Sequence, residues 1–251
     1  MSSLTISLIA FAFIFGGALA GMILRTSLPD HHFSDESKEV VKLGMGLVGT
    51  MAALILGLLV ASAKSSFDAQ SSELTQASAN AVVLDRVLAR YGPETGEARE
   101  ILRGAVTRVI EDTWSHDRHG SSQFGGTSSG SGIFLDKIQA LSAETEFQRA
   151  MKSQAWNMAL NVLQTRWLLY EQGATSVSKP MVVIMVFWLT IVFVSWGLIA
   201  PRNPTVVATL FTAALSVSGA IFLILDMYTP YTGVIQISKA PLQSALAVLG
   251  Q

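Results

Sequence analysis

Small side chains form a ladder in the apolar run 43–63, where every fourth residue is glycine or alanine. The ladder comprises Gly49, Ala53, Gly57 and Ala61. This spacing lets the backbones of two membrane helices approach closely, so helix packing is one interpretation. In the other, the same face surrounds the axis of an oligomer, and Thr50, Ala53 and Gly57 line a pore. A ring of Lys64 side chains at the pore exit would then favour anions.

Hydroxyl side chains form a second stripe, in the apolar run 205–225. Its members share one helix face at 4-3-4-3 spacing: Thr205, Thr209, Thr212, Ser216 and Gly219. Such hydroxyls could line a wet path, or donate to neighbouring helices or to carbonyls of their own helix. Asp226 follows on roughly the same face, as a charge on that path or as a fixed partner for Lys64 or Lys239. Because Asp226 stands immediately before a turn, we expect the structural role.

The remaining polar residues give little support for metal or catalytic chemistry. Two histidine pairs are present, His31 with His32 and His116 with His119. A pair without a third ligand is a weak metal signal, and the acidic residues around His31 are equally typical of a polar turn. The glycine-rich stretch 125–132 lacks the lysine that a phosphate-binding loop requires. We therefore predict no enzyme, no cofactor and no metal site.

The composition indicates a membrane protein. Of the 251 residues, 50% are hydrophobic and 14% are charged, and the mean hydropathy is +0.45, which is unusual for a water-soluble domain of this length. The formal net charge of -1 provides no basic excess for holding nucleic acid. The absence of cysteine excludes disulfides, thiolate nucleophiles and iron–sulfur clusters.

Four uncharged apolar runs are long enough to cross a bilayer as helices: residues 4–24, 43–63, 181–200 and 205–225. Each has about 20 residues, or about 30 Å of helix, which matches the hydrocarbon core of a bilayer. They pair into two hairpins. We expect an all-α integral membrane protein with one transmembrane hairpin in 1–63, a helical extramembrane insertion in 64–179, a second hairpin in 180–226, and a C-terminal turn and short helix in 227–251.

The basic residues indicate the orientation. Four spans place both chain ends and the insertion on the same side of the membrane. That side carries 13 of the 17 Lys and Arg residues, which favours a cytoplasmic insertion. Near the span ends, however, each side has four basic residues. We expect a multi-pass protein of a bacterial inner membrane with cytoplasmic termini.

Periodicity predicts that the insertion is helical. A heptad seam continues the second span beyond the membrane and stops before Gly92 and Pro93: Leu74, Ala77, Ala81, Leu84, Leu88 and Tyr91. A second helix is predicted from about Thr95 to Trp114, a flexible loop at 120–132, and a long third helix over 134–172. The seams suit an intrachain bundle as well as intersubunit coiled coils, so both remain open.

Two segments resemble a known family. They are residues 49–68, GTMAALILGLLVASAKSSFD, and residues 225–242, LDMYTPYTGVIQISKAPL. With Leu84-Asp85-Arg86 and Tyr91-Gly92-Pro93, they are similar to the bacterial bestrophin-like domain family of membrane proteins. The resemblance implies four spans with a helical cytosolic domain. It also implies a distant similarity to bestrophins, which are pentameric anion channels with the pore wall on their second span.

These observations predict a homo-oligomeric ion channel. A central pore requires several copies of the chain, and a ring of four or five subunits is favoured. The expected partners are the lipid bilayer, inorganic ions and further copies of the chain, and nucleic acid is excluded. The alternative belongs to a different class. It is a membrane-anchored scaffold or sensor that recruits a soluble partner through the face carrying Leu84 and Leu88.

Overall fold

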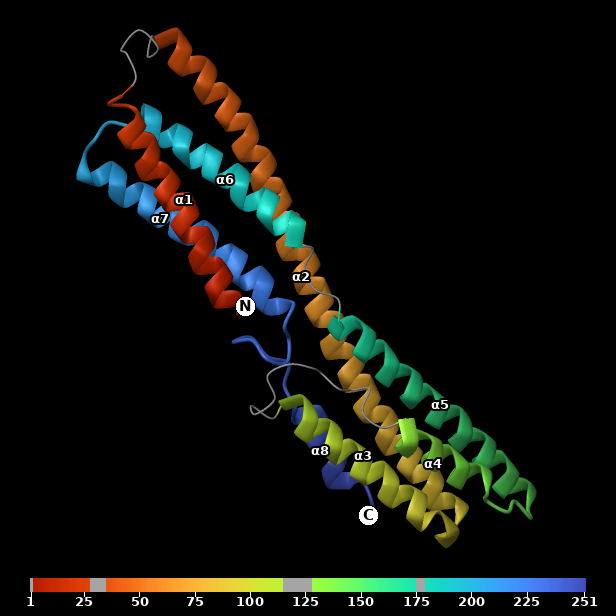
Figure 1. Cartoon of the computed structure of the whole chain (residues 1–251). Helices are drawn as coiled ribbons and strands as arrows, with labels where there is room; N and C mark the ends of the chain where they lie inside the picture. The colour runs from red at the N-terminus through yellow and green to blue at the C-terminus, as the bar shows by residue number, and fades with distance from the viewer. Residues whose placement is uncertain (1, 28–34, 115–127, 175–178) are drawn as a thin grey trace. The chain divides into compact units, whose positions relative to one another are not determined.

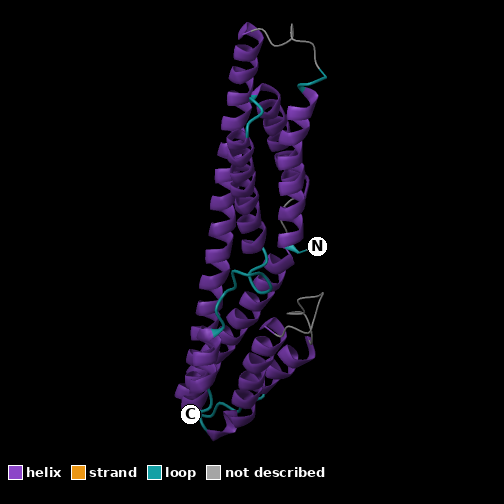
Figure 2. Cartoon of the chain, turned by 90° about the vertical axis from the view of Figure 1, so that its left-hand side faces the viewer, coloured by secondary structure: helices purple, strands orange, loops and turns teal. Residues whose placement is uncertain are grey.

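The computed structural model describes residues 2–27, 35–114, 128–174 and 179–251. Within these ranges every regular element is a helix, which confirms the expected all-α class (Figure 2). The chain divides into two compact units, which are described separately. The membrane unit comprises Met1–Ser66, Ser176–Thr229 and Gly233–Ile235, and the bundle unit comprises Phe67–Thr175, Pro230–Thr232 and Gln236–Gln251.

Four helices are long and apolar enough to cross a membrane, which confirms the four predicted spans. They are α1 (Ser3–Leu24), α2 (Asp35–Tyr91), α6 (Lys179–Ile199) and α7 (Pro204–Met227) (Figure 1). Two of them begin with a side-chain cap. The Ser2 hydroxyl accepts a hydrogen bond from the Thr5 N–H at 3.2 Å, and the Asn203 side chain accepts one from the Val206 N–H at 3.1 Å. Each cap satisfies a donor that the first helical turn leaves unpaired.

Helix α1 packs closely against α6 and also against α7. A Cβ atom added to Gly21 would overlap the backbone carbonyl of Val194, and one added to Gly197 would overlap that of Ala18. The two helices therefore cross with their backbones in contact, as small residues permit in a membrane. Close packing of α1 against α6 is therefore the role of Gly21.

Helix α2 is one continuous helix of 57 residues, so the predicted helical continuation of the second span to Tyr91 is confirmed. It begins at Asp35, which is eight residues before the expected span 43–63. The residues of this first part are largely charged, so hydropathy alone does not detect that they are helical. It ends at Tyr91, as predicted. Gly92 has a φ of 147°, a conformation that favours glycine, and the 3-10 turn Pro93–Thr95 follows.

The bundle unit combines the Phe67–Tyr91 part of α2 with α3 (Gly96–Trp114), α4 (Ser128–Gln139), α5 (Glu146–Ala174) and α8 (Ala240–Val248). Its buried core includes Leu74, Ala81, Leu84 and Leu88 of α2, Leu102 and Val106 of α3, Phe134 and Ile138 of α4, Ala155 and Ala159 of α5, and Leu242 of α8. The predicted heptad seam of α2 is thus buried within its own chain. This supports the intrachain bundle over an intersubunit coiled coil.

The long third helix expected over 134–172 is wrong, because two helices, α4 and α5, occupy this region. A reciprocal cap starts α5. The Thr145 hydroxyl accepts a hydrogen bond from the Gln148 N–H at 3.1 Å, and the Gln148 side chain accepts one from the Thr145 N–H at 3.2 Å. The expected loop 120–132 is also too long, since Ser128 already starts α4, and its remainder lies outside the described residues.

Candidate functional site

The membrane half of α2 has one face that packs inward and one that does not. Ala52, Leu59 and Ala63 are buried, whereas Ala53, Gly57 and Ala61 of the predicted ladder are exposed and Gly49 is half-buried. A Cβ atom added to Gly57 would have no described heavy atom within 4 Å. In contrast to Gly21 of α1, the ladder of α2 is not used for close packing within the described chain.

Two columns of exposed residues run along this uncovered face. The small column comprises Gly46, Thr50, Ala53 and Gly57, and the large column comprises Leu47, Met51, Leu54 and Leu58. The large side chains are between 49% and 70% exposed. Both columns have 4-3-4 spacing, the pattern of helices that pack at a shallow left-handed angle. The arrangement suits contact with further helices on both sides of α2.

The polar residues of this face lie at different depths. The Thr50 hydroxyl donates to the Gly46 carbonyl at 2.8 Å, one turn earlier in the same helix. Lys64 is exposed and stands three residues beyond Ala61, close to the end of the membrane unit at Ser66. The face therefore offers little polarity within the membrane and a positive charge at one end.

The hydroxyl stripe of α7 bonds to its own helix. Thr209, Thr212 and Ser216 each donate to the carbonyl four residues earlier, at 2.9 Å. These residues and Gly219 are exposed. A hydroxyl bonded in this way keeps lone pairs for other donors, but its proton is already used. The geometry thus favours the backbone-bonded interpretation of the stripe over a wet path.

Asp226 is 2% exposed and holds a turn of the chain together. Its carboxylate accepts hydrogen bonds from the N–H groups of Val234, at 3.1 Å, and Ile235, at 2.7 Å. These contacts support the structural role over a charge in a conduction path. Lys64 and Lys239, the cations considered as its partners, are not involved in either bond.

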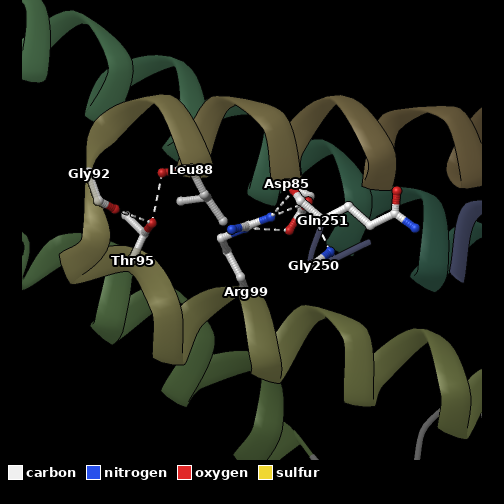
Figure 3. A network of polar contacts seen from close by, with 7 residues as sticks. All are labelled: Asp85, Leu88, Gly92, Thr95, Arg99, Gly250 and Gln251. Atoms are coloured by element: carbon white, nitrogen blue, oxygen red, sulfur yellow. Dashed lines mark hydrogen bonds and ion pairs between the residues drawn. The ribbon is translucent and has the colours of Figure 1, made fainter. Parts of the chain in front are cut away.

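The bundle unit contains a buried ion pair that the sequence patterns did not indicate (Figure 3). Arg99 donates through two nitrogens to the two carboxylate oxygens of Asp85, at 2.8 and 2.9 Å, and Asp85 is 3% exposed. The hydrogen bonds of this carboxylate raise the pKa of Arg99 above its usual value. Asp85 also accepts from the Gly250 N–H at 3.2 Å, and Arg99 donates to the Gln251 carbonyl at 3.1 Å. The pair therefore joins α2, α3 and the segment after α8.

The expected histidine pairs lie in parts of the chain outside the described residues: His31, His32, His116 and His119. Among the residues that the structure does describe, no group of three or more His, Cys, Asp or Glu side chains is arranged to hold a metal ion. Together, the fold and these surfaces define an all-helical, four-span membrane protein whose second span has an uncovered face.

Comparison with known proteins identifies the family. Residues 12–242 match the model of the bestrophin-like domain, so the chain belongs to the bestrophin-like domain family. No curated protein matches the sequence. The match to the family reaches into both units and covers the second half of α1 and the whole of α2, α6 and α7.

Solved structures share the fold. A point variant of a bacterial bestrophin homologue from Klebsiella pneumoniae is 12% identical, with a TM-score of 0.67 over 98% of this chain and 99% of that chain. A second variant of that homologue is 13% identical, with a TM-score of 0.67 over 99% and 97% of the two chains. A variant described as a membrane protein is 12% identical, with a TM-score of 0.65 over 97% and 96%. At such low identity the likeness concerns the fold alone.

Proposed function

We propose that this chain is one subunit of a homo-oligomeric ion channel whose pore is lined by the membrane half of α2. The observation that carries the proposal is the uncovered face of α2, with its small and large columns side by side. Small residues in a membrane helix are typical of contact with another helix rather than with lipid. Family membership supports the same function, because the resemblance to bestrophins implies an ion channel with the pore wall on this span.

The spacing of the two columns favours a ring. Each large residue follows a small one directly, so the columns point about 100° apart around the helix axis. In a closed ring of parallel helices, each helix meets its two neighbours in directions about 90° apart for four subunits and about 108° apart for five. The large column of one subunit then packs against the small column of the next in a ring of four or five.

In this ring the edges of the two columns that face each other line the axis, and the rest of each column contacts the neighbouring subunit. Thr50, Gly57 and Ala61 are spaced seven and four residues apart, which keeps them on that face. Leu54 shares the face and contributes an apolar constriction. Lys64 follows three residues after Ala61, so a ring of lysines lies at one end of the pore and gives a preference for anions.

The location follows from the spans and the charge distribution. The channel lies in a bacterial inner membrane, with the bundle unit and both termini in the cytoplasm. The scaffold alternative finds less support, because its recruiting face is used inside the chain. Leu84 and Leu88 are both 0% exposed in the core of the bundle unit.

Cysteine cross-linking in native membranes tests the ring, since the chain has no cysteine of its own. One chain carries Ala53→Cys in the small column, and a second, with a different tag, carries Leu54→Cys in the large column. We expect disulfide-linked mixed dimers when the two are expressed together, and little cross-linking of either alone. As a control, Leu54→Cys is paired with Leu215→Cys on exposed α7, which is 54% exposed and lies outside both columns.

Two results would count against this arrangement. Cross-linking of each single variant with itself, at the same rate as the mixture, would indicate a two-fold contact instead of a ring. Equal cross-linking of the control pair would indicate random collision. In the expected result, a chain that carries both Ala53→Cys and Leu54→Cys cross-links to both of its neighbours. The products then form a ladder that ends at four or five subunits.

A further inference from the structure

Two arginines at one end of the membrane unit cap each other's helices. Arg25 follows the end of α1, and its Nη1 donates to the carbonyls of Ala200 at 2.6 Å and Ile199 at 3.5 Å, at the end of α6. Arg202 follows the end of α6, and its Nη2 donates to the carbonyl of Met22 in α1. The last carbonyls of a helix have no partner within it, so the exchange satisfies both ends.

An open cavity of about 340 Å³ lies between these groups. It is lined by Arg25, Thr26, Pro201 and Arg202. Arg25 is half-buried and Arg202 is exposed. The two guanidinium groups therefore face a shared space, and the contacts with the helix carbonyls fix their positions before any ligand arrives. Preorganised donors of this kind lose little conformational freedom on binding.

The chemistry of the cavity suits an oxyanion. A guanidinium has five N–H donors in a planar fork, so an arginine that caps a helix through one nitrogen can donate to phosphate through another. The described residues that line the cavity include no carboxylate. Both arginines carry a positive charge, which favours an anionic group at this place.

The cavity also lies at the depth of lipid headgroups. Its arginines stand directly after the membrane spans of α1 and α6, which end at Leu24 and Ile199. Residues at this position reach the interface between the hydrocarbon and water, where lipid phosphates lie.

We infer that Arg25 and Arg202 form a binding site for the phosphodiester of an anionic lipid headgroup. The lipid bridges the ends of α1 and α6 and reinforces their contact at Gly21 and Gly197. Free inorganic phosphate has the same oxyanion chemistry, but it lacks the acyl chains that hold a lipid beside these helices. The inference is independent of whether the chain conducts ions.

The test uses the purified full-length protein in a neutral detergent. Bound lipid is counted by native mass spectrometry during titration with phosphatidylglycerol, and separately with phosphatidylcholine and inorganic phosphate. We expect Arg202→Gln and Arg25→Gln each to weaken phosphatidylglycerol binding roughly tenfold, as the loss of a charge-assisted hydrogen bond implies. Arg202→Lys keeps the charge but not the fork, and we expect an intermediate loss.

A matched control is Arg108→Gln, since Arg108 is also exposed and its Nε donates to a helix carbonyl, that of Gly104, at 3.2 Å. It should bind phosphatidylglycerol as the unchanged protein does. Unchanged binding by Arg202→Gln and Arg25→Gln, with thermal unfolding confirming that both variants are folded, would overturn the inference. Displacement of the lipid by inorganic phosphate at equal concentration would overturn the lipid as the ligand.

Discussion

The carboxylate of Asp226 accepts a 2.7 Å hydrogen bond from the backbone N–H of Ile235, nine residues further along the chain. The bond closes a turn directly after α7, and the Val234 N–H joins it at 3.1 Å. Gly233 makes the turn possible, because a Cβ atom at this position would lie 2.6 Å from a carboxylate oxygen of Asp226. An acidic residue at the end of a membrane helix thus acts as a structural anchor.

The first prediction concerns this turn. Gly233→Ala should lower the stability of the protein by about 1–3 kcal/mol, because the added methyl group must displace the Asp226 carboxylate from its N–H donors. Thermal unfolding in detergent, followed by circular dichroism, measures the change. Gly219→Ala is the control, since a Cβ atom there meets no described heavy atom within 4 Å. Equal stability of the two variants would show that the turn is not held by Asp226.

A second prediction concerns the crossing of α1 and α6. Gly21→Ala places a Cβ atom on the Val194 carbonyl, so the helices must separate, and we expect a loss of at least about 1–3 kcal/mol. Gly16→Ala, on the same helix, has open space and should be neutral or slightly stabilising, since alanine favours the helix. The yield of folded protein and its unfolding temperature compare the two. Similar values would contradict the close crossing.

The third prediction compares two ion pairs. Arg99→Gln leaves the Asp85 carboxylate buried without its cation, which should reduce stability by about 3–5 kcal/mol. Lys137→Gln breaks the 2.7 Å pair with Glu97, whose side chains are 42% and 64% exposed, and should change stability by at most about 1 kcal/mol. Urea unfolding of both variants measures the difference. A small effect of Arg99→Gln would mean that water replaces the guanidinium.

A fourth prediction is a loss of stability at high pH. Burial, and next the charge of Glu73, raise the pKa of Tyr231 from 10.0 to about 12. The folded protein therefore keeps this proton more tightly than the unfolded chain does. Its contribution to stability is complete below pH about 10 and is lost as the pH rises to about 12.

The Tyr231→Phe variant tests this assignment. Burial also raises the pKa of Tyr91, so titration of tyrosinate absorbance should show one late-ionising tyrosine fewer in the variant than in the unchanged protein. Unfolding at pH about 9 and about 12 should differ less for the variant than for the unchanged protein. If the difference between the two titrations appeared near pH 10.0, Tyr231 would have its ordinary pKa.

Apolar periodicity made the membrane spans and the extent of α2 predictable. The seam from Leu74 to Leu88 keeps its phase until Gly92 and Pro93, both of which are strong helix stops. The break between α4 and α5 was missed, because apolar spacing does not register a cap. Thr145 and Gln148 do carry a readable signal, since threonine followed three residues later by glutamine is a capping box.

Other features of the site leave no trace in a single sequence. Asp226 bonds to backbone N–H groups, which every residue but proline possesses, so no side-chain pattern identifies Val234 and Ile235 as its partners. Gly17 and Gly21 have the four-residue spacing of the α2 ladder, but this spacing does not show that Gly197 of α6 lies opposite. The glycines of α1 and α2 have the same spacing in the sequence, but Gly21 is in close contact with α6 whereas Gly57 has open space around it.

Ion flux into liposomes tests the central claim most directly. The purified protein is reconstituted, and chloride and potassium gradients are varied independently. Gly57→Leu fills the proposed pore face of α2, whereas Gly219→Leu places the same side chain on the hydroxyl stripe of α7, and both glycines have open space around them. Lys64→Glu tests whether the charge at the pore end selects the ion.

The account predicts chloride flux that Gly57→Leu abolishes, that Gly219→Leu leaves unchanged, and that Lys64→Glu shifts towards cations. Subunit number, measured on the same samples, should be equal for all variants. Flux that survives Gly57→Leu in a correctly assembled oligomer would contradict α2 as the pore wall. If Gly219→Leu alone blocked the flux, the conducting path would lie along α7.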